Sequence, residues 1–194
     1  AMISEPVNKP DVQAVWRNYE IMRPGSRENS RLLTLGKSDK NSILGFSTDR
    51  TWGDFAVYNL YNSDQEKSTD ITLNFEEAGL PKGTRCAVYD FWENQVVGYA
   101  SNSFTGKNIP KNGSLLLRFT PLIGEFPQLV GSNLHLLIGA TEIEEIYTTS
   151  KSIKIMLSSA GAQTGDLFFH STKAIEAGLT ENCLISSVQG LGDN

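Results

Sequence analysis

The chain has 194 residues, of which 39% are hydrophobic and 20% charged, and its formal net charge is −5 at pH 7. This composition is ordinary for a globular protein and excludes a disordered chain. The 17 Lys and Arg residues are scattered, so the basic stripe of a nucleic-acid-binding surface is missing. No apolar run approaches the roughly 20 residues of a membrane-spanning helix. The sequence therefore predicts neither a nucleic-acid partner nor a membrane partner.

Residues 1–25 are expected to form one amphipathic helix. Four apolar side chains recur at the i, i+3, i+4 and i+7 spacing that lines one helix face: Val12, Val15, Trp16 and Tyr19. Asn8 is the candidate N-cap, and Pro24-Gly25 ends the run. Such a face needs a partner, which is either the β-structure that follows or a domain outside this chain. Left exposed, it would join two copies into a homodimer.

Residues 26–122 are expected to form an antiparallel Greek-key β-sandwich. Between Phe55 and Gly98, apolar and polar residues alternate in three runs, over 57–61, 71–75 and 86–91. A period of two places every second side chain on one face, so each run predicts a strand with one face in a core. Turn residues separate the runs about every 8 to 12 residues, which is typical of a sandwich. Further strands are predicted over 32–35, 43–47, 99–104 and 115–119.

Residues 127–194 are expected to form a second β-rich module after a linker at 122–127. Strands are predicted over 134–138, 143–149, 153–157, 167–171 and 184–188. The runs 143–149 and 153–157 are expected to pair as a hairpin. The chain begins with Ala-Met-Ile and ends in mid-pattern, which suggests a piece of a longer protein.

The sequence gives no positive reason to assign a catalytic site, a metal or a cofactor. Glycoside hydrolysis needs two carboxylates across one bond, but the acidic residues lie mostly in predicted turns or, like Glu142, on the outer face of a strand. His135 and His170 each alternate with apolar neighbours in a predicted strand. Cys86 and Cys183 have no zinc-ligand spacing, and Cys86, inside a predicted strand, is expected to be a buried free thiol.

Two aromatic residues are candidates for a carbohydrate-binding site. The rings of Trp52 and Tyr99 could pack on the apolar face of a pyranose. Such a site also needs neighbouring carboxylates or amides, and Asp54 and Asn102 are the candidates for that role. The alternative for Trp52 is that its ring folds over an edge of the core.

A series of short motifs runs through residues 44–121. In order, these are a strand with Asn-Leu at 59–60, an alternating strand at 71–75, a Gly-Leu turn at 79–80, an Asp-x-Trp strand end at 90–92 and a final strand motif at 112–121. Their order and spacing resemble the C-terminal β-sandwich of α-galactosidase-type (melibiase-like) glycoside hydrolases, families 27 and 36. Residues 10–15 loosely resemble the last helix of the catalytic barrel in those enzymes.

The resemblance implies a non-catalytic C-terminal accessory region that supports an absent catalytic barrel. In that family the catalytic aspartates lie on barrel strands, and no position here matches them. The parent would be a secreted or periplasmic glycoside hydrolase of bacterial type. Trp92 is a candidate for packing between sandwich and barrel, its alternative being the sandwich core. A carbohydrate-binding module that acts without a barrel, and an adhesion sandwich with no carbohydrate role, are the other hypotheses.

Overall fold

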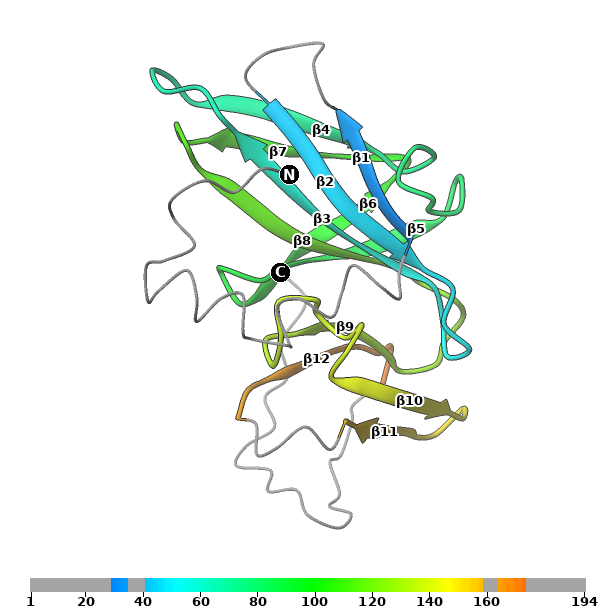
Figure 1. Ribbon diagram of the computed structural model, residues 1–194. Helices are drawn as coiled ribbons and strands as arrows, with labels where there is room; N and C mark the ends of the chain where they lie inside the picture. The colour runs from blue at the N-terminus through cyan, green and yellow to red at the C-terminus, as the bar shows by residue number, and fades with distance from the viewer. Residues whose placement is uncertain (1–28, 35–40, 159–163, 174–194) are drawn as a thin grey trace.

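The computed structural model describes residues 29–34, 41–158 and 164–173, and every regular element in these ranges is a β-strand (Figure 1). The strands are β1 (Asn29–Thr34), β2 (Asn41–Thr48), β3 (Phe55–Asn62), β4 (Thr69–Asn74), β5 (Arg85–Asp90), β6 (Gln95–Ser101), β7 (Ser103–Ile109), β8 (Ser114–Pro121), β9 (Gln128–Ser132), β10 (Ile143–Thr148), β11 (Ile153–Leu157) and β12 (Leu167–His170). The all-β prediction is therefore confirmed. The helix expected over 1–25, the strand expected over 184–188 and Cys183 lie outside the described residues. Within the described ranges, no helix is long and apolar enough to cross a membrane.

The antiparallel sandwich is confirmed as well. Six strands form one sheet in the order β1-β2-β3-β8-β5-β6, and β4 pairs with β7 in a second sheet. The chain leaves the large sheet after β3 to make β4 and returns for β5 and β6. It leaves again for β7 and returns as β8, between β3 and β5. This is the crossing pattern of a Greek key.

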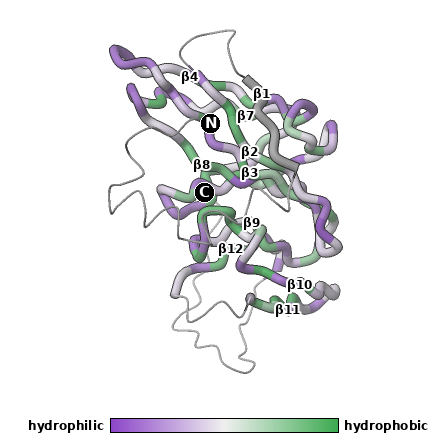
Figure 2. Tube along the Cα trace, viewed as in Figure 1, coloured by the Kyte–Doolittle hydropathy of each residue, from purple (hydrophilic) through white to green (hydrophobic). Residues whose placement is uncertain are grey.

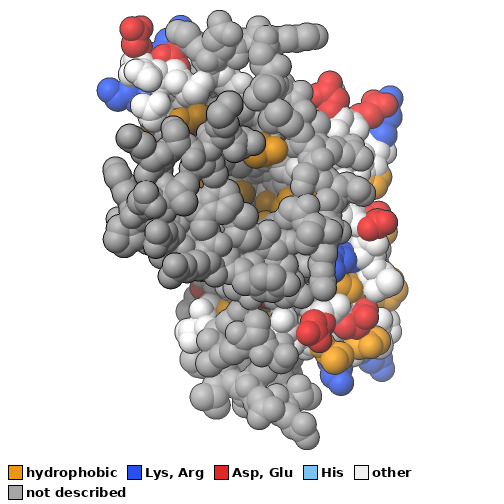
Figure 3. Space-filling model, in the orientation of Figure 1, with side chains coloured by type: hydrophobic (Ala, Val, Ile, Leu, Met, Phe, Trp, Pro, Cys, Tyr) orange, Lys and Arg blue, Asp and Glu red, His pale blue; other side chains and the backbone are white. Residues whose placement is uncertain are grey.

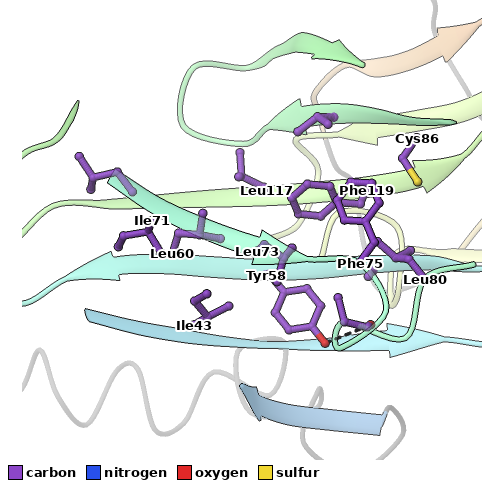
Figure 4. Packing of buried hydrophobic residues seen from close by; sticks show 14 residues of the cluster. Ile43, Tyr58, Leu60, Ile71, Leu73, Phe75, Leu80, Cys86, Leu117 and Phe119 are labelled. Atoms are coloured by element: carbon purple, nitrogen blue, oxygen red, sulfur yellow. Dashed lines mark hydrogen bonds between the residues drawn. The ribbon is translucent and has the colours of Figure 1, made fainter. Parts of the chain in front are cut away.

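The main core lies between the two sheets of the sandwich (Figure 4). Its fully buried side chains come from both layers, Tyr58 and Phe119 from the large sheet and Leu73 from β4. The Tyr58 hydroxyl donates a hydrogen bond of 3.2 Å to the carbonyl of Ala78, so its one polar atom is satisfied. Cys86 is buried here as a free thiol, as predicted. In Figure 2 the hydrophobic residues follow the central strands, whereas the loops at the ends are hydrophilic.

The central strands of the large sheet, β3, β5 and β8, are buried on both faces, which differs from the one-sided strands predicted from the alternation. On β3, Tyr58 and Leu60 enter the main core, whereas Phe55 and Val57 enter a second cluster on the opposite face. Residues beyond the sandwich complete that second cluster, among them the buried Ile138. The C-terminal region therefore lies directly against the sheet (Figure 1).

The C-terminal region contains two small antiparallel sheets, β10-β11 and β12-β9. The predicted hairpin of β10 and β11 is confirmed, and the amide of Thr149 closes its turn with a bond of 2.8 Å to the carbonyl of Ser152. A third cluster of apolar residues, among them Leu129, Ile143 and Ile146, fills the space between the sheets. The domain division at 122–127 stays a prediction.

Two strand predictions are wrong. Residues 134–138 form successive turns instead, in which the amide of Ile138 donates to the carbonyl of His135 and Ile138 itself has φ 48°. These residues alternate in polarity because some of them, such as Leu137 and Ile138, pack on the large sheet, and not because they pair with another strand. The single strand expected over 99–104 is two strands, because Asn102 adopts a left-handed conformation (φ 67°) that interrupts the strand. At this residue the chain passes from β6 in the large sheet to β7 in the second sheet.

Candidate functional site

The most unusual group in the described structure is a fully buried arginine between the sandwich and the C-terminal region. Arg118 lies in β8, opposite Val57 of β3, and points away from the main core with only 1% of its surface exposed. Its guanidinium carbon lies 3.8 Å from the centroid of the Phe55 ring, close enough for a cation–π interaction. Arg118 lies in the strand sequence Leu-Leu-Leu-Arg-Phe, and the alternation of apolar and polar residues does not predict that it is buried.

The guanidinium of Arg118 is held by oxygen atoms from both regions. Its Nε donates to the Thr120 hydroxyl at 2.8 Å, within the sandwich. Its two Nη atoms donate to backbone carbonyls of the C-terminal region, that of Ile138 at 2.5 Å and that of Leu129 at 3.0 Å. Arg118 therefore fastens the C-terminal region to the sheet with charge-assisted hydrogen bonds.

Burial makes the charge on Arg118 costly. Desolvation lowers the pKa of its guanidinium to about 9, and the nearby negative charge of Glu142 opposes part of that shift. Glu142 is itself buried, with 2% exposed, which corrects the prediction that it lies on an outer strand face. Its Oε1 accepts a 2.6 Å hydrogen bond from the amide of Gly139. The carboxylate is thus used to fix the turn that carries the Ile138 carbonyl.

Gly139 is required where this turn passes the arginine. Its φ is 103°, in the region that side chains rarely adopt, and a Cβ on Gly139 would collide with Nη1 of Arg118. A second close approach occurs at Gly131 in β9, where a Cβ would meet the ring of Tyr89. The contact between the C-terminal region and the sheet thus depends on two glycines.

A small hollow opens beside Arg118, with a volume of about 30 Å³. Its lining comes from the loop before β3, from β8 and β9, and from the β10–β11 hairpin: Trp52, Gly53, Asp54, Arg118, Thr120, Gln128, Leu129, Ile146, Thr148 and Ile153. A hollow of this size has room for about two water molecules. It is too small for a pyranose ring.

The residues of β9 that line this hollow are Gln128 and Leu129, and the hairpin contributes Ile146, Thr148 and Ile153. The lining is mixed: Asp54, Gln128 and Thr148 are polar, as are Arg118 and Thr120, and the other side chains are apolar. It lies at the contact between the sandwich and the C-terminal region, and its lining comes from both.

Two of the predicted carbohydrate-binding residues, Trp52 and Asp54, lie in the loop between β2 and β3. Asp54 is exposed, whereas Trp52 is half-buried and stacks on Phe55, with ring centroids 5.5 Å apart. Trp52 also packs against the second and the third apolar clusters. The alternative stated for this ring, packing over an edge of the core, describes its position in the structure.

The other two predicted residues, Tyr99 and Asn102, lie on β6 and in the turn after it. Tyr99 is 46% exposed, its hydroxyl lies 3.0 Å from Nδ1 of His170, and the guanidinium of Arg85 lies 4.2 Å from its ring centroid. β8 and β5 separate β3 from β6. Adjacent strands are about 4.8 Å apart, so roughly 14 Å separates Tyr99 from the Trp52 loop. The structure does not bring the four residues into one cluster.

Trp92 lies in the turn between β5 and β6 and is 57% exposed, so it is not part of the sandwich core. The turn is firmly built: Oδ1 of the buried Asp90 accepts hydrogen bonds from the amides of Trp92 and Glu93, at 2.9 and 3.2 Å. The ring of Phe91 meets the Trp92 ring edge-on, with centroids 5.0 Å apart. The interdomain role of Trp92 stays a prediction, and that of the helix residues Val12, Val15, Trp16 and Tyr19 lies outside the described residues.

The described part of the chain contains no group of three or more His, Cys, Asp or Glu residues that could hold a metal ion. His135 lies in a turn, where its Nδ1 accepts a 3.1 Å hydrogen bond from the amide of Leu137. His170 lies in β12 beside Tyr99. Arg118 was not among the site residues predicted from the sequence. The feature that could have indicated it is the position of an arginine within a mainly apolar strand.

Comparison with known proteins confirms the resemblance predicted from the sequence. Residues 49–119 match the family model described as the alpha galactosidase C-terminal beta sandwich domain. The matched segment begins just before β3 and ends in β8. It therefore covers most of the sandwich and stops before the C-terminal region. No curated protein matches the chain.

Solved structures of family 27 glycoside hydrolases are similar in part. A β-L-arabinopyranosidase from Geobacillus stearothermophilus has a TM-score of 0.43 and 12% identity, over 60% of this chain and 25% of its own. Alpha-galactosidase I from Mortierella vinacea has a TM-score of 0.39 and 19% identity, over 46% of this chain and 22% of its own. The matches span about a quarter of the length of these proteins, and at such TM-scores they support no further conclusion.

Proposed function

We propose that this chain is the non-catalytic C-terminal accessory region of a glycoside hydrolase and that it supports a catalytic barrel outside the chain. The observation that carries the proposal is the match of residues 49–119 to the C-terminal sandwich of alpha galactosidases. The parent's activity is part of the same proposal.

The buried carboxylates of the described residues favour a structural role over a catalytic one. Asp90 accepts two backbone hydrogen bonds and holds the turn of Trp92. Glu142 accepts the amide of Gly139 and holds the turn beside Arg118. Both carboxylates thus accept hydrogen bonds from backbone amides in turns.

Support of a barrel requires surface that the chain can bury against it. The rigid turn at Trp92 offers an exposed indole that loses little conformational freedom on binding. The apolar helix face predicted over residues 12–19 is the second surface that we assign to this contact. Carbohydrate binding through Trp52, Asp54, Tyr99 and Asn102 stays a prediction, and the separation of Trp52 from Tyr99 weighs against a single site.

The proposal is tested by two measurements on the chain and its gene. The purified chain is expected to release no nitrophenol from aryl α-galactosides and related aryl glycosides, with its fold verified by circular dichroism. The coding sequence upstream is expected to encode a hydrolase barrel in the same reading frame. Turnover by the isolated chain would contradict the non-catalytic role, and an upstream region without a hydrolase would contradict the accessory role.

A further inference from the structure

The β10–β11 hairpin is a small sheet with one open face. Among the described strands, these two pair only with each other. On the inner face, Ile146 and Ile155 stand opposite each other and belong to the third cluster. The outer face carries Tyr147 and Met156, which are 56% and 42% exposed. A hairpin of two strands is marginally stable by itself, so a partner that covers its outer face would stabilise it.

The outer face combines apolar and charged side chains in a regular arrangement. Tyr147 stands opposite Lys154, and Glu145 stands opposite Met156. Residues at i and i+2 of a strand share a face, so these four side chains form a square. The two apolar side chains occupy one diagonal of the square, and the two opposite charges occupy the other. In Figure 3 the surface over this hairpin shows hydrophobic side chains beside both acidic and basic groups.

Both charges on this face can bind a partner. Lys154 is exposed, and within the described ranges it has no ion pair. Glu145 is half-buried, and the hydroxyl of Thr51 donates a hydrogen bond of 3.2 Å to its Oε1, which leaves Oε2 for another donor. Glu145 and Lys154 occupy diagonal positions, which are about 7–8 Å apart in a sheet, and they form no ion pair with each other.

We propose that the outer face of the β10–β11 hairpin binds the same face of a second copy of this chain. A two-fold interface requires a self-complementary surface, and the square has this property. A two-fold axis along the apolar diagonal brings the two Tyr147 rings together and the two Met156 side chains together. The same axis pairs Glu145 of each copy with Lys154 of the other. The strands of the two copies then cross at a large angle, as in orthogonal sheet packing.

The dimer is expected to be weak and reversible. Four side chains cover far less than the roughly 800 Å² per partner of a stable complex. The inference does not depend on the accessory role, because it uses only contacts of the C-terminal region. It also uses none of the residues that we assign to the barrel contact.

Sedimentation equilibrium of the full chain over a range of concentrations measures this association. We expect a monomer–dimer equilibrium that weakens as salt is added, because salt screens exposed charges. Tyr147→Ser is expected to raise the Kd at least about tenfold, because it removes an apolar contact at the centre. Glu145→Lys and Lys154→Glu are each expected to raise the Kd by a similar factor, because each places like charges opposite one another.

A mixture of the two charge variants tests the pairing itself. Glu145→Lys has two cations on the charged diagonal and Lys154→Glu has two carboxylates, so one copy of each forms both ion pairs. We expect the mixture to form a heterodimer at concentrations where each variant alone is monomeric, with the fold of both verified by circular dichroism. Glu66→Lys makes the same change of charge in the exposed loop between β3 and β4, and this matched control is expected to keep the original Kd.

Three results would overturn the proposal. The first is a chain that stays monomeric at millimolar concentration. The second is a dimer that persists unchanged in both charge variants, which would place the contact on another surface, such as the helix face predicted over residues 12–19. The third is a mixture of the two folded charge variants that stays monomeric.

Discussion

Replacement of Arg118 by alanine would remove the group that fastens the C-terminal region to the sheet. Two buried carbonyls, those of Ile138 and Leu129, would lose their donor, at about 1–3 kcal/mol each. The contact with the Phe55 ring, worth about 2 kcal/mol when desolvated, would be lost as well. The recovered hydration of the guanidinium offsets several kcal/mol. The net loss in the free energy of unfolding is expected to be about 2–4 kcal/mol, including the cavity that alanine leaves.

Two further substitutions separate charge from volume. Arg118→Met fills the space without a buried charge, so it is expected to cost less than alanine, about 1–2 kcal/mol. Arg118→Lys keeps the charge, but a compact ammonium cannot serve Thr120, Ile138 and Leu129 together. It is therefore expected to cost more than methionine.

The assay is urea unfolding at constant pH, followed by tryptophan fluorescence and by circular dichroism. Arg85→Ala is the matched control, because Arg85 also stacks on an aromatic ring, that of Tyr99, but is exposed. It is expected to change the free energy of unfolding by less than about 0.5 kcal/mol. If Arg118→Ala were as mild as this control, the guanidinium would not fasten the two regions.

Three other predictions follow from the same contacts. Gly139→Ala is expected to cost about 1–3 kcal/mol more in urea unfolding than Gly53→Ala, because both glycines have positive φ but only the first would meet Arg118; equal costs would contradict this packing. Burial raises the pKa of Cys86 to about 11, so in a Cys183→Ser background the unfolded thiol ionises first and the free energy of unfolding falls from pH 9 to 11. The Cys86→Ala variant should lack that component of the fall, and identical pH profiles would refute it. A chain that ends after Leu122 would uncover Phe55, Val57 and Tyr89 of the second cluster, so it is expected to bind a hydrophobic dye and aggregate; a monomer without dye binding would show that the sandwich is complete alone.

Local patterns in the sequence were sufficient for the strands that pair with near neighbours. The hairpin of β10 and β11 follows from two alternating runs and a polar turn, and the end of β5 at Asp90 follows from the turn residues after it. The sandwich resemblance likewise rests on short motifs within β3 to β8.

The errors arise where one strand serves two cores or where an apolar run packs without pairing. The period of two predicts one buried face for β3, and Phe55 and Val57 are buried on the other face because a distant segment covers them. Residues 134–138 are apolar for the same contact, although they form turns. A single window of sequence carries no information on such long-range contacts.

The candidate site shows the same limit. Trp52 and Tyr99 were chosen as aromatic residues near loops, but sheet order places β8 and β5 between them. Arg118 was not predicted as a site residue because two of its acceptors are the backbone carbonyls of Leu129 and Ile138. Every residue has a backbone carbonyl, so the sequence does not indicate which of them will bind an arginine. The close approach of Gly139 to Arg118 was likewise not predicted from the sequence.

The central claim, that this chain supports a catalytic barrel, is tested most directly on the parent protein. The half-life of hydrolase activity at elevated temperature is compared between the full parent and a product that ends before Asn29. The accessory role predicts a shorter half-life for the shortened product, with kcat/KM at low temperature nearly unchanged, because the lost surface stabilises the barrel without touching the substrate. Equal half-lives for the two products would contradict it.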